Sequence, residues 1–185
     1  MITATLVFVL LAGPGDKVLD GAKSQLAWKT AYTTGYVKIP YPGGDLPRNQ
    51  GVCTDVVIRA LRYAGRDLQA LIHTDMKAHF AKYPQNWGAK RTDANIDHRR
   101  VPNQIRFLER FGKALPRTVT ATTLKEWKPG DLVYWKLPNG LDHCGVVSDI
   151  KNRRGVPFAI HNIAGIAEED CLQTWTITGH FRYPK

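Results

Sequence analysis

Apolar residues recur every three or four positions over the first two thirds of the chain, the spacing of amphipathic helices. On this basis we expect helices over residues 16–32, 53–64, 68–82 and 103–111. Asp67 is placed to cap the third of these, and Gly65 and Gly112 follow the second and the fourth. The Pro- and Gly-rich stretch 39–47 and the polar stretch 84–102 are expected to be irregular.

The last third of the chain changes to short runs rich in Val, Ile, Trp, Tyr and Thr, with turn residues between them. These runs predict strands over residues 131–136, 143–150, 156–163 and 173–183. Helices followed by strands with short connections indicate an α+β fold. We expect N-terminal helices packed on a C-terminal antiparallel β-meander or half-barrel.

Length and charge narrow the class of protein. The chain has 185 residues, 43% of them hydrophobic, which suits one globular domain over residues 16–185. Its net charge of +10 favours a polyanionic partner. The Lys and Arg residues are scattered and carry no nucleic-acid-binding motif, so nucleic acid is not the expected partner. A monomer is expected.

Residues 1–15 contain no charged residue and are mostly apolar, and the small residues at 12–13 and 21–22 offer places for cleavage. The length of this segment matches the core of a signal peptide and falls short of a membrane span, so we expect no stable membrane insertion. A buried N-terminal strand is the alternative interpretation. Export to the periplasm or the outside is the expectation.

Cys53 and His143 are the first candidates for chemistry. Cys53 opens a predicted helix, where the dipole and the free N–H groups favour a thiolate. His143 begins a predicted strand and is the natural base for a thiol. On the next strand His161 is expected to orient His143, because its parity matches the small residues Gly145 and Ala159; its neighbour Asn162 is the alternative.

Six further residues are candidates for substrate binding. Asp55 lies in the first helical turn, where a carboxylate is also stabilised by the dipole. Tyr41 lies in the loop before Cys53 and is a candidate oxyanion donor or a packing residue. The run Asp97, His98, Arg99 and Arg100 fits either a site for a substrate carboxylate or a structural salt-bridge cluster.

The other two cysteines, Cys144 and Cys171, have no metal-site spacing and are expected to be structural. Strand alternation turns Cys144 away from the face that carries His143. A disulfide between Cys144 and Cys171 is an open alternative in an exported protein.

Four motifs, G-V-C-T-D, P-G-D-L-V-Y-W, D-H-C-G-V-V and I-H-N-I-A-G, resemble those of the NlpC-type cell-wall peptidases. The separation of Cys53 from His143 is shorter than in papain itself, which fits this compact branch. The sequence departs from the usual motif in one place, since Val52 stands where Asp commonly precedes the cysteine.

A second resemblance covers nearly everything from about residue 25 onward. The segments I-P-Y-P-G-G-D-L-P, G-V-C-T-D-V-V-I-R-A, N-I-D-H-R-R-V-P-N and I-T-G-H-F-R-Y are similar to a bacterial family described only as a domain of unknown function. The two resemblances imply a papain-like fold and, by analogy, a hydrolase role.

The expected function is a secreted cysteine peptidase or amidase that cleaves an amide in peptidoglycan, or in another anionic peptide polymer, through an acyl-enzyme. This chemistry requires no metal and no organic cofactor. Two alternatives are an inactive cell-wall binding module and a cysteine-dependent acyltransferase of the same fold.

Overall fold

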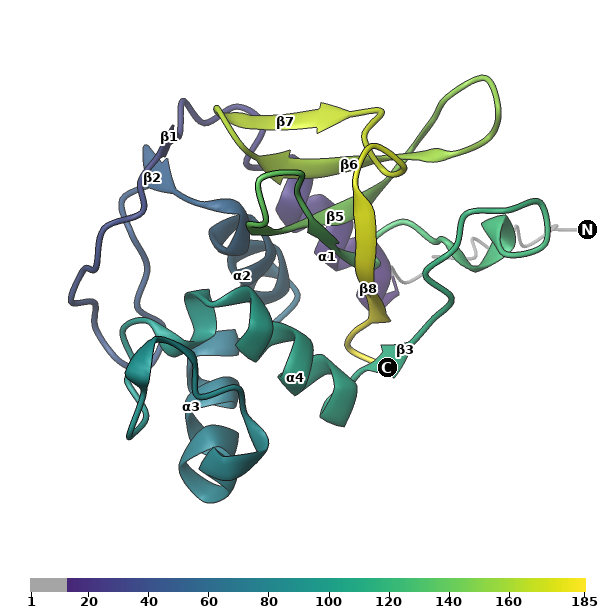
Figure 1. Cartoon of the computed structure of the whole chain (residues 1–185). Coiled ribbons are helices and arrows are strands. Elements are labelled where there is room, and N and C mark those ends of the chain that lie inside the picture. The colour runs from purple at the N-terminus through teal and green to yellow at the C-terminus, as the bar shows by residue number, and fades with distance from the viewer. Residues whose placement is uncertain (1–12) are drawn as a thin grey trace, which may run out of the picture.

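The computed structural model describes residues 13–185 and has mixed α+β architecture (Figure 1). Most of the expected signal segment therefore lies outside the described residues. The four α-helices are α1 (Pro14–Lys23), α2 (Cys53–Tyr63), α3 (Leu68–His79) and α4 (Val101–Phe111). The 3-10 helices are η1 (Phe80–Lys82), η2 (Asn86–Gly88), η3 (Asp97–Arg99) and η4 (Leu124–Glu126). No helix among these described residues is long and apolar enough to cross a membrane.

Three of the predicted helices are confirmed with small shifts at their ends. Asp67 caps α3, since its side chain accepts a hydrogen bond from the backbone N–H of Gln69. Gly65, with a φ of 77°, follows α2 as expected of a residue that ends a helix.

The predicted helix over residues 16–32 is wrong in length, because α1 ends at Lys23. After α1 the chain turns, and the ring of Trp28 lies under the guanidinium groups of Arg48 and Arg59, 5.1 and 5.3 Å from its centroid. The next residues then form a short strand, β1 (Ala31–Tyr32), parallel to β2 (Gln50–Gly51). Tertiary contacts to Trp28 and pairing with β2 replace the helix that local spacing predicts.

One six-stranded antiparallel sheet forms the second layer, in the order β3-β8-β4-β5-β6-β7. The strands are β3 (Lys113–Ala114), β4 (Leu132–Lys136), β5 (Asp142–Lys151), β6 (Pro157–Asn162), β7 (Ile166–Glu169) and β8 (Thr176–Arg182). The four predicted strands correspond to β4, β5, β6 and β8. Strand β7, which forms the upper edge in Figure 1, was not predicted, because four residues with two Glu carry little strand signal.

The two faces of the sheet bury different cores, since successive side chains of a strand point to opposite faces. One core joins Tyr134, Cys144, Val146 and Ile160 to the apolar face of α2. The other contains Val133, Trp135, Val147 and Ala159, together with Trp127 and Leu172. Cys144 therefore faces the helices, whereas His143 beside it shares a face with Trp135.

The turn before β4 is held by a buried carboxylate. Asp131 is 1% exposed and accepts hydrogen bonds from Arg182 Nε at 2.7 Å and Nη2 at 2.8 Å. Its Oδ2 also lies 3.1 Å from His180 Nε2 and 2.8 Å from the backbone N–H of Lys128. Gly130 before it has a φ of 82°, and a Cβ there would lie 2.1 Å from the carbonyl oxygen of Gly15. Only glycine fits at that position.

Replacing Asp131 with Ala should destabilise the fold by about 3–5 kcal/mol, because Arg182 and His180 lose their shared buried partner. Denaturant unfolding followed by circular dichroism measures the change. The matched control is Asp149→Ala, which removes a partly exposed ion pair with Lys23 and should cost no more than about 1 kcal/mol. Equal effects of the two substitutions would contradict the structural role of Asp131.

Candidate active site

Cys53 is the first residue of α2 and is 3% exposed. The side chain of Asp55 fixes this helix start, since its Oδ2 accepts the backbone N–H of Val52 at 2.7 Å. A sulfur at the first helical position lies among N–H groups that have no partner within the helix. These groups and the helix dipole stabilise negative charge there.

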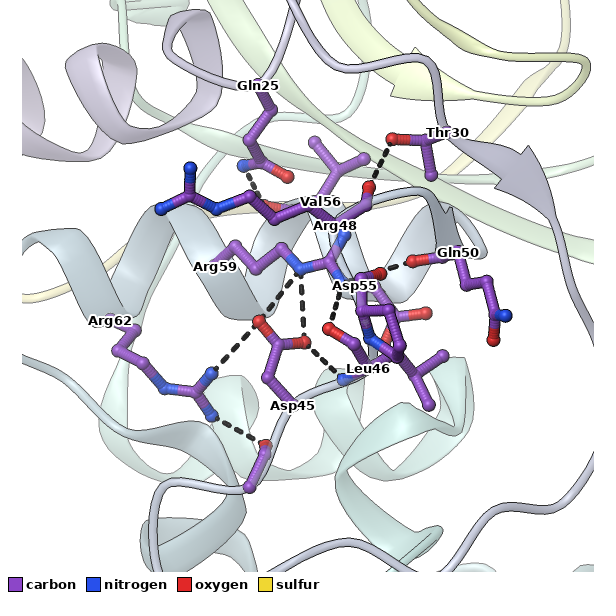
Figure 2. A network of polar contacts seen from close by, with 12 residues as sticks. Gln25, Thr30, Asp45, Leu46, Arg48, Gln50, Asp55, Val56, Arg59 and Arg62 are labelled. Carbon is purple, nitrogen blue, oxygen red and sulfur yellow. Dashed lines mark hydrogen bonds and ion pairs between the residues drawn. The ribbon is translucent and has the colours of Figure 1, made fainter.

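The segment that leads into Cys53 is anchored along α2 by Arg59, as Figure 2 shows. Arg59 Nε donates to both carboxylate oxygens of Asp45, at 3.1 and 3.0 Å. Its Nη2 donates to the carbonyl oxygens of Leu46 at 3.1 Å and Gln50 at 3.0 Å. Arg62 lies 3.5 Å from the same carboxylate. Because one guanidinium binds Asp45, Leu46 and Gln50, it holds the loop that precedes Cys53 against α2.

The thiol of Cys53 is strongly acidic in this setting. Hydrogen bonds from the Cys144 thiol, and next from the His143 side chain, lower the pKa of Cys53 to about 5 although burial acts in the opposite direction. Burial and the neighbouring Cys53 raise the pKa of Cys144 well above its usual value, so Cys144 keeps its proton. The arrangement is therefore a Cys53 thiolate that accepts hydrogen bonds from Cys144 and His143.

His143 has its two ring nitrogens engaged in different directions. Nε2 lies 3.0 Å from Nδ1 of His161, the residue that strand parity favoured. This leaves Nδ1 of His143 for the thiol of Cys53. The indoles of Trp135 and Trp175 flank the His143 ring, with centroids at 5.7 and 5.5 Å. Asn162 faces the other way and donates to the carbonyl of Gly51 at 3.3 Å.

Glu169, which sequence reasoning missed, extends this row of side chains. Its Oε2 lies 3.2 Å from Nε2 of His161, and its side chain is 57% exposed. Register places Glu169 opposite Ala159, on the face that carries His161. Strand parity within I-A-E-E identifies this glutamate only once β7 is known, because β7 has to be paired with β6 first.

The candidate residues of the run 97–100 mostly point inward. Arg99 binds Asp55 with two hydrogen bonds of 2.9 Å, and both side chains are buried. Asp97 is buried, which raises its pKa, and burial lowers the pKa of His98 to about 4. The salt-bridge interpretation therefore describes Asp55 and Arg99. Arg100 is the residue of the run that turns outward, and its guanidinium lies 4.2 Å from the centroid of the Trp87 ring.

A cleft of about 460 Å³ opens at the start of α2. Its lining residues are Tyr32, Thr34, Val52, Cys53, Thr54, Trp87, Ile96, Arg99, Arg100, Val101, Pro102, Gly140, Leu141 and Asp142. Tyr32, Trp87 and Leu141 give it an exposed apolar rim. The sulfur thus lies beside the residues that lead into β5.

Tyr41 does not line this cleft, and its ring packs against that of His73 with a centroid distance of 5.0 Å. The tyrosine that lines the cleft beside Cys53 is Tyr32, whereas the sequence analysis had suggested Tyr41. Burial, followed by the negative charge of Cys53, raises the pKa of Tyr32, and its hydroxyl hydrogen-bonds to Cys53. Tyr32 was missed because it fell inside the wrongly extended first helix.

All three cysteines of the chain, which lie within residues 13–185, are free. The disulfide alternative for Cys144 and Cys171 is wrong in this structure, because Cys144 belongs to the core beside α2 and Cys171 to the core on the opposite face. Cys144 was expected to be only structural, but its thiol also hydrogen-bonds to Cys53 and lowers the pKa of that residue. Burial raises the pKa of Cys171 to about 12.

Comparisons with known proteins give one family and one similar protein. Residues 19–183 match the family described as "Domain of unknown function (DUF1287)". A protein of Escherichia coli (strain K12), described as "Uncharacterized protein YijF", is 51% identical over 167 residues, which cover 90% of this chain and 80% of that protein. Neither description names a cell-wall peptidase, so the likeness to NlpC-type enzymes enters only the proposal below.

Titration of the thiols tests this geometry without a substrate. The ultraviolet absorbance of thiolate, with Cys53→Ser as background, should disappear as the pH falls through about 5. Cys144→Ala and His143→Ala should each move the midpoint to higher pH, because each removes a hydrogen bond to the sulfur. Cys171→Ala is the matched control and should leave it unchanged. A midpoint near the ordinary thiol value of about 8.5 would show that Cys53 is not activated.

Proposed function

The chain belongs to the DUF1287 family, and we propose that it is an exported cysteine hydrolase that cleaves an amide bond in the stem peptides of peptidoglycan. The observation that carries the proposal is the acidic thiol of Cys53, hydrogen-bonded to His143, whose far nitrogen lies 3.0 Å from His161. A cysteine hydrolase site consists of a nucleophile, a base and an orienting group that are hydrogen-bonded in that order, and Cys53, His143 and His161 fit these three roles.

A papain-like, NlpC-type fold is part of the proposal. It is supported by a helix that opens at the nucleophile and packs on an antiparallel sheet. The base and the orienting residue then come from the neighbouring strands β5 and β6.

In the proposed reaction the Cys53 thiolate attacks the amide carbonyl carbon, and the carbonyl oxygen gains negative charge. The backbone N–H of Cys53 binds that oxygen at the start of α2, and the Tyr32 hydroxyl is the side-chain donor in reach of the sulfur. His143 protonates the departing amine as the carbon–nitrogen bond breaks, which leaves a thioester on Cys53. His143 then takes a proton from water, whose oxygen attacks the thioester carbon. The carbon–sulfur bond breaks, which releases the carboxylic acid and restores the Cys53 thiolate.

The substrate assignment draws on the cleft and the charge of the chain. The apolar rim of Tyr32, Trp87 and Leu141 suits the side chains of a peptide, and Arg100 suits a carboxylate. The net charge of +10 draws the protein to an anionic polymer such as peptidoglycan. Export, proposed from the apolar residues 1–15, would bring the enzyme to that substrate.

Digestion of purified peptidoglycan fragments tests the activity. Mass spectrometry should show products that have gained one water, and Cys53→Ala should slow their release by more than about 1000-fold. Cys171→Ala, which removes a thiol on the other face of the sheet, should have no effect. Binding of the fragments without cleavage would replace the proposal with a cell-wall binding module. Capture of the acyl group by an added amine, in place of water, would make the protein an acyltransferase.

A second test separates the two neighbours on β6. His161→Ala should lower kcat by about 10- to 100-fold, the loss seen when the orienting partner of a metal-bound histidine is removed. Asn162→Ala should do much less to kcat, because Asn162 bonds the Gly51 carbonyl and faces away from His143. Both variants are compared at equal folded fractions, measured by circular dichroism. A larger loss of kcat from Asn162→Ala would show that the orienting residue lies on the other face of β6 and that the assignment to His161 is wrong.

A further inference from the structure

The row of hydrogen bonds behind Cys53 ends at a carboxylate. His143 Nε2 lies 3.0 Å from His161 Nδ1, and His161 Nε2 lies 3.2 Å from Glu169 Oε2. An ionised carboxylate only accepts hydrogen bonds, whereas each neutral imidazole has one donating and one accepting nitrogen. The direction of every bond in the row therefore follows from its last member.

Beginning at Glu169, the assignment leaves no choice. His161 must donate from Nε2 to the carboxylate, so its Nδ1 carries a lone pair and accepts. His143 must then donate from Nε2 to His161, so its Nδ1 is the atom that takes the proton of Cys53 and, once protonated, donates to the thiolate. That is the tautomer in which His143 can accept the thiol proton of Cys53.

We infer that Glu169 is a positioning residue of this site, which fixes the tautomers of His161 and His143 and stabilises the positive charge that His143 gains from Cys53. The inference rests on the proposed function and adds to it a residue outside the cleft. No proton has to reach Glu169 for this role, as with the carboxylate of the serine-protease triad.

The two glutamates of β7, Glu168 and Glu169, have different surroundings, and those of Glu169 support a functional role. Glu169 and His161 line a second cavity, of about 440 Å³, with Trp175 and Gly165. This cavity shares no lining residue with the cleft that holds Cys53, so Glu169 lies outside that cleft. Glu168 points to the opposite face and accepts a hydrogen bond from Ser148.

The negative charge of Glu169 acts on the pKa of His161 in a known direction. Burial, and next the charge of His143, lower the pKa of His161, while Glu169 acts to raise it. The titratable groups around Glu169 are His161 on β6, His143 beyond it on β5, and Asp170 and Cys171 on the following turn. Loss of Glu169 therefore removes an interaction that raises the pKa of His161, so His161 should lose its proton at lower pH.

Three variants test the inference. Glu169→Ala removes both acceptor and charge, Glu169→Gln keeps a carbonyl acceptor without the charge, and Glu168→Gln is the matched control. Nitrogen NMR of the imidazoles in the free protein should show His161 and His143 protonated at Nε2 in the wild type and in Glu169→Gln. The same spectra of Glu169→Ala should show mixed tautomers.

Kinetics on the peptidoglycan fragments supply the second readout. Both Glu169 variants should lower kcat by about tenfold, with KM unchanged, and should move the basic limb of the pH–rate profile to lower pH. Glu168→Gln should match the wild type in both measurements. Wild-type tautomers and an unshifted basic limb in Glu169→Ala would overturn the inference. If the wild type cleaves no fragment, the proposed function fails, and the NMR spectra alone still decide whether Glu169 sets the tautomers.

Discussion

The carboxylate of Asp55 makes three hydrogen bonds, one to the backbone N–H of Val52 and two to the guanidinium of Arg99. The first fixes where α2 begins and so places Cys53. The other two join that helix start to the segment that forms a wall of the cleft. Removing one partner of a buried ion pair leaves the other charge without compensation, so Asp55 and Arg99 each hold the other in place. The position of Cys53 and one wall of the cleft are therefore tied to the same carboxylate.

Much of the fold follows from local patterns in the sequence. Helical spacing predicted α2, α3 and α4, and runs of β-branched and aromatic residues predicted β4, β5, β6 and β8. Local patterns failed where distant residues decide the conformation. Residues 16–32 have helical spacing throughout, but α1 ends at Lys23, and beyond it Trp28 packs against Arg48 and Arg59 and β1 pairs with β2.

The site shows the same division. Cys53, His143 and His161 were recognisable because each has a local signature, a helix start or a strand parity, and the structure brings them together. Tyr32 and Glu169 have no such signature, since each approaches the site only through pairing of a short strand. The run 97–100 contains both kinds of residue. Its charges were visible, but which of them turn inward depends on Asp55, 44 residues from Arg99 along the chain.

The sheet separates the site into two environments. On the helix side Cys53 lies with the Cys144 thiol in a buried, largely apolar core. On the opposite side His143 and His161 lie among indole rings, and the row ends at the exposed carboxylate of Glu169. Glycine at position 145 leaves room for His161 on the neighbouring strand. A Cβ at Gly145 would lie 2.7 Å from the carbonyl oxygen of Ile160 and 3.1 Å from the Cβ of His161.

Cys53 belongs to the helical layer and His143 to the sheet, so the pair exists only while α2 is packed on β5. Proteins open in cooperative units whose free energies differ, and a helix layer and a sheet are natural units of this kind. An opening that separates the two layers moves Cys53 away from His143 while the secondary structure of each layer persists. The acidity of the Cys53 thiol depends on contact with Cys144 and His143, so it reports how firmly α2 is packed on β5.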